Sequence, residues 1–152
     1  IGEALGRRER AEELALRLEE QHARVAERAA GRGRVRFLYL IWRGPWMAAA
    51  RDTYIDALLT AAGGANVLAQ SDSRYPEVDL REVAEHGIDR VLLSSEPFPF
   101  KERHVAEVRA ALGGSSSATI ERVDGRLLSW HGASAIPGLA YAEQALRSAG
   151  EE

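Results

Sequence analysis

Three segments of the sequence gather aromatic and charged side chains that could bind a large flat molecule. They are residues 42–51, 94–100 and 129–135, and each follows a stretch with the composition of a buried strand. All three tryptophans fall in these segments, at Trp42, Trp46 and Trp130. Such rings supply apolar area and stacking for a planar or macrocyclic ligand. The alternative is that they only cover the end of a sheet.

The histidines and serines give little support for catalysis. His22, His86, His104 and His131 are scattered, without the spacing of metal ligands. Residues 94–96, Ser-Ser-Glu, lack the flanking glycines of a nucleophile elbow. We therefore expect no enzyme, no catalytic residue, no resident cofactor and no metal site made by the protein alone.

Two of the histidines carry specific expectations. His131 follows Trp130 in the third segment, and its imidazole could be an axial ligand to the cobalt or iron of a bound chelate. The alternative for His131 is a rim histidine with ordinary hydrogen bonds. His104 is expected on a solvent-facing turn, with no role in binding.

The elements that position these segments alternate between helix and strand. A long helix is predicted over residues 7–30, because apolar residues recur there at steps of three and four. A turn is predicted over residues 123–126, on the Asp-Gly pair. The remaining predicted strands cover residues 35–41, 66–68, 90–93 and 118–122, and the remaining helices residues 53–62, 79–86, 102–112 and 137–147.

This alternation indicates an α/β fold with a mostly parallel sheet covered on both faces, a three-layer Rossmann-like architecture. In such folds ligands bind beyond the carboxyl ends of the strands. The three aromatic segments are all predicted to lie there.

The overall composition excludes some classes of protein. The 152 residues carry a net charge of −3, which argues against a nucleic-acid-binding surface. There is no cysteine, and no apolar run approaches the length of a membrane span. The chain starts at Ile1 without a signal-peptide pattern, so a trimmed product or a fragment is expected.

A series of short segments, in order along most of the chain, resembles the class III periplasmic binding proteins of ABC importers. Those proteins are the receptors for vitamin B12, haem and ferric siderophores, and the similarity is greatest to the cobalamin-binding branch. The segments that carry the resemblance are residues 42–46 (WRGPW), 54–59 (YIDALL), 63–67 (GGANV), 75–78 (YPEV), 90–100 (RVLLSSEPFPF), 123–125 (VDG) and 128–132 (LSWHG).

The resemblance implies a two-lobed receptor in which a long rigid helix joins the lobes and the ligand lies between them. Residues 1–33 would be this connecting helix and residues 34–152 the C-terminal α/β lobe, with the N-terminal lobe missing from the chain. It also implies an ABC transporter permease as partner. The location would be the periplasm or another extracytoplasmic site, with or without a membrane anchor.

The resemblance also carries over aromatic ligand-binding positions. Tyr75 matches the place of an aromatic residue against the corrin, Trp130 an aromatic residue in the last ligand-facing loop, and Trp46 an aromatic residue after the first strand. Trp42 belongs to the same expected rim.

Charged residues beside these rings could bond the periphery of the ligand. Arg43 and Arg51 would favour an anionic chelate, whereas Glu96 would favour amide groups, and the sequence leaves that choice open. Family members also dock on the permease through a glutamate on each lobe. The matching position here holds Arg81, with Glu82 beside it, and one residue turns a helical side chain by about 100°.

Two functions therefore follow from the sequence. The first is the solute-binding component of an ABC importer, for a cobalamin or other corrinoid first and for haem or a ferric siderophore next. The second is a stand-alone α/β interaction domain without a ligand. In that case the apolar stripe of the long helix could make a homodimer.

Overall fold

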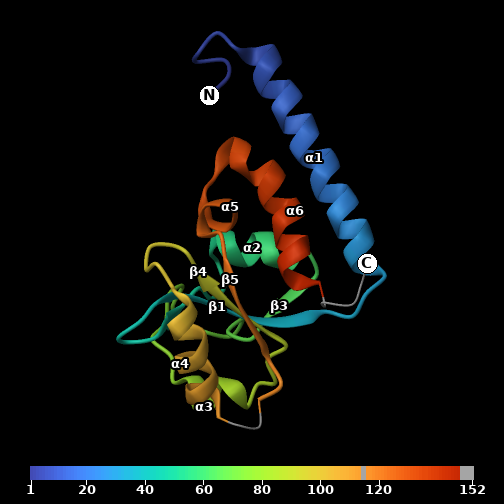
Figure 1. Cartoon of the computed structure of the whole chain (residues 1–152). Coiled ribbons are helices and arrows are strands. Elements are labelled where there is room, and N and C mark those ends of the chain that lie inside the picture. Colours follow the sequence, from blue (N-terminus) through green and yellow to red (C-terminus); the bar gives the residue numbers. More distant parts are fainter. Residues whose placement is uncertain (114–115, 148–152) are drawn as a thin grey trace.

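The computed structural model describes residues 1–113 and 116–147 and has an α/β architecture (Figure 1). The helices are α1 (Arg8–Ala30), α2 (Tyr54–Ala61), α3 (Leu80–Ala84), α4 (Glu102–Leu112), α5 (Gly125–Ser129), the 3-10 turn η1 (Gly132–Ser134) and α6 (Ala135–Leu146). The strands are β1 (Val35–Trp42), β2 (Met47–Ala48), β3 (Gly64–Asn66), β4 (Arg90–Ser94) and β5 (Thr119–Val123).

Strand β1 lies at the centre of the sheet. The order of strands across the sheet is β2-β1-β4-β5. Strand β3 pairs with the first half of β1, on the same side of β1 as β2. The pairs of β1 with β3, β1 with β4 and β4 with β5 are parallel, whereas β2 returns antiparallel to β1. The predicted mostly parallel sheet is confirmed, and β2 is an addition that the sequence did not indicate.

The sheet is covered on both faces, so the predicted three layers are confirmed. Phe37 and Tyr39 of β1 face a core shared with α1, α2, α5 and α6. Leu38 and Leu40 face the opposite core, which α3 and α4 complete. Figure 1 shows the two helical layers above and below the sheet. Four consecutive buried residues in one strand are what burial on both faces requires.

Most predicted elements match within two or three residues, and three predictions are wrong. Segment 129–135 was expected to follow a strand, but it follows helix α5. The Asp-Gly pair does not make a turn between strands: the Asp124 carboxylate caps the N-terminus of α5 by accepting the Arg126 N–H, and the helix begins at Gly125. His104 does not face solvent either. It lies in the first turn of α4 and is 2% exposed, because its ring packs among Phe98 and Phe100.

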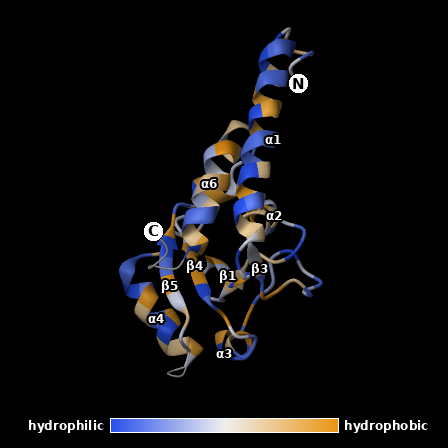
Figure 2. Ribbon diagram, turned by 90° about the vertical axis from the view of Figure 1, so that its right-hand side faces the viewer, coloured by the Kyte–Doolittle hydropathy of each residue, from blue (hydrophilic) through white to orange (hydrophobic). Residues whose placement is uncertain are grey.

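The long helix α1 is held to the lobe at its C-terminal end. Val25 is fully buried against the core, and Arg28 makes two hydrogen bonds to the Glu143 carboxylate of α6, at 2.9 and 2.7 Å. Arg32 and Arg147 add bonds of 3.2 and 3.1 Å to the same carboxylate. The other end of α1 extends past α6 and away from the sheet (Figures 1 and 2).

Removing the Glu143 charge should loosen this attachment. Hydrogen bonds from Arg28, and then from Arg147, lower the pKa of Glu143 from 4.5 to about 2. Its stabilisation is therefore present above pH 4.5 and is lost as the pH falls through about 2. Glu143→Gln should lower the free energy of unfolding by about 2 kcal/mol at pH 7, measured by urea denaturation. The gap between wild type and variant should close towards pH 2.

The matched control is Glu20→Gln, which breaks the exposed pair with Arg24 and should cost at most about 0.5 kcal/mol. Equal effects of the two substitutions would contradict a special role for Glu143.

The buried imidazole of His104 should make the free energy of unfolding depend on pH near neutrality as well. Burial lowers the pKa of its imidazole below the ordinary 6.5, and Nδ1 accepts the Lys101 N–H at 2.8 Å. The unfolded chain therefore takes up the proton first, and stability is lost as the pH falls below about 6.5. Urea denaturation between pH 7.5 and 5.5 should show a smaller loss for His104→Asn than for wild type. The exposed His22→Asn should behave like wild type, and a wild-type slope in His104→Asn would refute the assignment.

Candidate ligand-binding edge

The carboxyl ends of β1, β4 and β5 lie at one edge of the sheet, as their parallel registers require. The loop after β3 joins this edge, because Ala48 and Ala50 donate backbone hydrogen bonds to Pro76 and Arg74. We call the combined surface of residues 42–51, 71–78, 94–100 and 124–131 the carboxyl edge. It contains every residue that the sequence proposed for ligand binding.

Three aromatic side chains project from the carboxyl edge into solvent. Trp42 is 41% exposed, Tyr75 47% and Trp130 57%. Trp42 is the last residue of β1, Tyr75 lies in the loop after β3, and Trp130 directly follows α5. Large rings with this much exposed apolar area cost free energy in water, so an edge that presents several of them is suited to a flat apolar partner.

Hydrogen bonds from buried side chains hold the loop between β4 and α4, residues 95–101, in place. The buried Tyr39 hydroxyl donates to Ser94 Oγ at 3.0 Å, and Ser94 Oγ donates to the Glu96 carbonyl at 2.5 Å. Burial raises the pKa of Tyr39 above its ordinary value, so this phenol remains a donor. From the same loop, Phe98 meets the edge of Trp42 with ring centroids 5.6 Å apart.

Glu96 joins this loop to the segment after β5. Its carboxylate oxygen Oε1 accepts the Trp130 indole N–H at 2.5 Å. The Ser129 hydroxyl lies 3.3 Å from the same oxygen and donates its proton to the Gly125 carbonyl at 2.6 Å. Glu96 was expected to bond the ligand, but in the structure it bonds the chain's own indole. Ser129 was not singled out by the sequence, and a lone serine in a short helix carries no signal that would have found it.

Gly125 allows the two segments to approach each other. A Cβ at this position would overlap Ser94 Oγ and lie 2.8 Å from Glu96 Cγ. Its N–H donates to Ser95 Oγ at 2.9 Å. The Asp-Gly pair therefore serves close packing and helix capping together.

The two tryptophans at the end of β1 and just after it differ in burial, because Trp42 is exposed and Trp46 packs within the lobe. Trp46 is half-buried and stacks parallel to Phe100, with centroids 6.3 Å apart and planes at 5°. Arg43 lies over the Trp46 ring at 5.8 Å and pairs with Glu107 of α4 at 2.6 Å. Both residues are thus engaged within the lobe, while Trp42 is open.

Arg51 and His131 flank the other end of the edge. Arg51 Nε donates to the Ser71 carbonyl at 2.6 Å, and its guanidinium lies 3.7 Å from the Asp72 carboxylate. His131 is exposed, and its ring is tilted over Tyr54 at 4.4 Å. Within the described residues, no three His, Asp or Glu side chains are placed to hold a metal ion.

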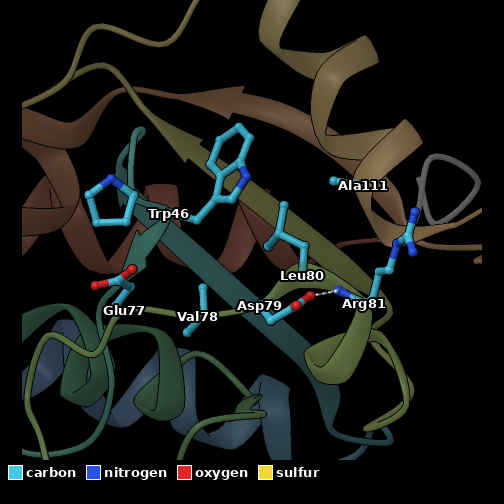
Figure 3. A pocket seen from close by; sticks show the side chains of 8 residues that line it. Trp46, Glu77, Val78, Asp79, Leu80, Arg81 and Ala111 are labelled. Carbon is cyan, nitrogen blue, oxygen red and sulfur yellow. Dashed lines mark hydrogen bonds between the residues drawn. The ribbon is translucent and has the colours of Figure 1, made fainter.

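Two open pockets lie near these loops. One, of about 570 Å³, opens between the ends of β4 and β5 and includes Glu96, Asp124 and Arg126. Hydrogen bonds from Arg126 lower the pKa of the Asp124 carboxyl, so the two side chains are paired with each other. The other, of about 590 Å³, lies between Trp46 and the start of α3 (Figure 3).

Glu82, the candidate docking residue, lies on α3 and is exposed. Arg81 precedes it and is also exposed, whereas Val83 is buried. Both charged side chains are therefore available to a partner on this side of the lobe.

Comparison with sequence profiles of protein families matches residues 1–126 to the family described as "Periplasmic binding protein". The chain belongs to this family. Proteins of the family are extracytoplasmic, non-enzymatic components of transport. A comparison of this periplasmic binding protein with curated protein sequences finds no match.

Solved structures with the same fold include three proteins that are described by the molecule they bind or by their transport system. The vitamin B12 binding protein BtuF of Vibrio cholerae is 16% identical with a TM-score of 0.68, over 84% of this chain and 50% of that one. The haem-binding protein RhuT from Roseiflexus sp. RS-1 is 21% identical with a TM-score of 0.73, over 96% and 60%. A Fe3+-hydroxamate transport protein from Saccharomonospora viridis is 21% identical with a TM-score of 0.70, over 97% and 52%.

These identities establish the fold of the periplasmic binding protein, and the chain spans only about half to 60% of the length of those structures. Across residues 1–113 and 116–147, none of its helices combines the length and apolar character needed to cross a membrane.

Gly125→Ala tests whether the carboxyl edge depends on close packing of its loops. The added methyl group has no room between Ser94 and Glu96, so the free energy of unfolding should fall by about 1–3 kcal/mol. Urea denaturation measures it. Gly33→Ala is the control, because no atom lies within 4 Å of its added Cβ. A neutral Gly125→Ala would contradict the packing described.

Proposed function

We propose that this chain is the C-terminal lobe and connecting helix of a two-lobed receptor that delivers a metal chelate to an ABC importer. The observation that carries the proposal is the presence of three exposed aromatic rings on the carboxyl edge, those of Trp42, Tyr75 and Trp130. Aromatic side chains lose few torsions on binding and offer large flat surfaces to a corrin or porphyrin. The names of the structural neighbours, which include vitamin B12 and haem binding proteins, support the same class of ligand.

The charges of the carboxyl edge favour a corrinoid over haem. Arg43 pairs with Glu107, Arg51 bonds the Ser71 carbonyl near Asp72, and Arg126 pairs with Asp124. Anionic propionates would have to compete with these internal partners for the arginines, at a cost of about 0.2–1 kcal/mol for each exposed pair. A periphery of neutral amides can instead share hydrogen bonds with groups that are already paired. We therefore rank cobalamin first, and haem or a ferric siderophore next.

The connecting helix and the docking surface complete the proposed receptor. The half of α1 beyond the Glu143 attachment would reach the N-terminal lobe, so that the ligand is enclosed between two lobes. Exposed Glu82 on α3 would meet the permease, with Arg81 beside it. The receptor would act in the periplasm or on the outer face of the membrane.

A second candidate rests on the outer half of α1 and the turn before it. Leu16 of α1 is 60% exposed and Leu5 of the preceding turn is 69% exposed, which is compatible with a partner along this helix and with a stand-alone interaction or dimerisation domain. Light scattering separates the two readings: a stable dimer that ignores chelates would favour the second.

The receptor proposal predicts saturable binding of cyanocobalamin, with haemin weaker. Calorimetry on the chain with each chelate should show this order. Trp130→Ala and Tyr75→Ala should each weaken cobalamin binding by about tenfold or more, since each removes a stacking surface worth about 1.4 kcal/mol.

Leu16→Ala is the matched control, because it removes an exposed apolar side chain of α1 that is not part of the carboxyl edge, and it should bind like wild type. Tighter binding of haemin would reverse the proposed order of ligands. No saturation by cobalamin, haemin or a ferric hydroxamate, either in this chain or in the protein with its N-terminal lobe restored, would contradict the receptor.

A further inference from the structure

One oxygen of Glu96 holds the indole of the segment after β5. Oε1 accepts the Trp130 indole N–H at 2.5 Å. The indole has a single donor and no acceptor, so this bond uses all of its hydrogen-bonding capacity. The ring is nevertheless 57% exposed. It is therefore held at its N–H edge, with much of its surface left open.

Glu96 is itself held by the interior of the lobe. Its N–H donates to Ser94 Oγ at 3.2 Å, and its carbonyl accepts from the same hydroxyl. Ser94 is fully buried and accepts the Tyr39 hydroxyl. Gly125, the first residue of α5, leaves room for the Glu96 side chain, since an added Cβ there would lie 2.8 Å from Glu96 Cγ. A continuous set of contacts thus runs from the central strand to the exposed indole.

We propose that Glu96 is a positioning residue, which fixes the indole of Trp130 so that one face of the ring is presented to the chelate. The inference rests on the proposed function and differs from it in one respect, because Glu96 acts through Trp130 and not by touching the ligand. A hydrogen bond to a charged acceptor is short and strong, which suits it to restrain an exposed ring. Fixing the ring before binding removes the entropy cost of ordering it in the complex.

The indole N–H of Trp130 reports this contact without any ligand. In ¹H–¹⁵N spectra its signal is assigned by its absence in Trp130→Phe. Glu96→Ala should move the Trp130 indole proton upfield and speed its exchange with solvent, because the acceptor is gone. Glu96→Gln, which keeps a carbonyl acceptor, should restore part of both effects. The indole signals of Trp42 and Trp46 serve as internal controls and should stay in place. An unchanged Trp130 signal in Glu96→Ala would overturn the proposal.

Cobalamin binding then separates a positioning role from direct contact. Glu96→Ala and Trp130→Phe should each weaken binding by roughly two- to tenfold, because both leave the ring free. The double variant should be no weaker than the weaker single variant. Effects that multiply would instead make Glu96 a direct ligand contact and overturn the positioning role. If no chelate binds at all, the proposed function fails, while the indole spectra still decide whether Glu96 holds Trp130.

Discussion

Burial of β1 on both faces is the constraint on which the rest of the lobe depends. Residues 37–40 are inaccessible and alternate between two separate cores. Helices must therefore cover both sides, and three other strands pair with β1 along its length. Since β4 and β5 run parallel to it, their carboxyl ends meet at one edge, and the loops that follow are brought together there.

The same constraint explains which features could be predicted from the sequence. Residues 35–41, apolar or aromatic except for Arg36, predict a buried strand, and the helical period of residues 102–112 predicts α4 to the residue. Segments 42–51 and 94–100 adjoin β1 and β4 as expected, whereas segment 129–135 follows helix α5 and not a strand. These signals are local, and each is repeated over many residues, so the pattern survives whatever surrounds it.

What could not be predicted depends on partners distant in the chain. Strand β2 has only two residues, and its Met47 also bridges to Glu77. A strand this short shows no periodic pattern in the sequence that would predict it. His104 is buried because aromatic residues of the preceding loop pack on it. Arg43 is paired with Glu107 and Glu96 with Trp130, at separations of 64 and 34 residues. In each case residue type indicated a polar role, and only the fold decided the partner.

The central claim is that the exposed rings Trp42, Tyr75 and Trp130, and not the pocket between Trp46 and α3, receive a flat chelate. The three tryptophans distinguish these places, because Trp42 and Trp130 are open on the edge while Trp46 stacks on Phe100 and lines the other pocket. The direct measurement follows the three indole signals in ¹H–¹⁵N spectra during addition of cyanocobalamin. The account predicts saturable shifts of Trp42 and Trp130 with Trp46 nearly still. A response of Trp46 alone, or of none of the three, would contradict it.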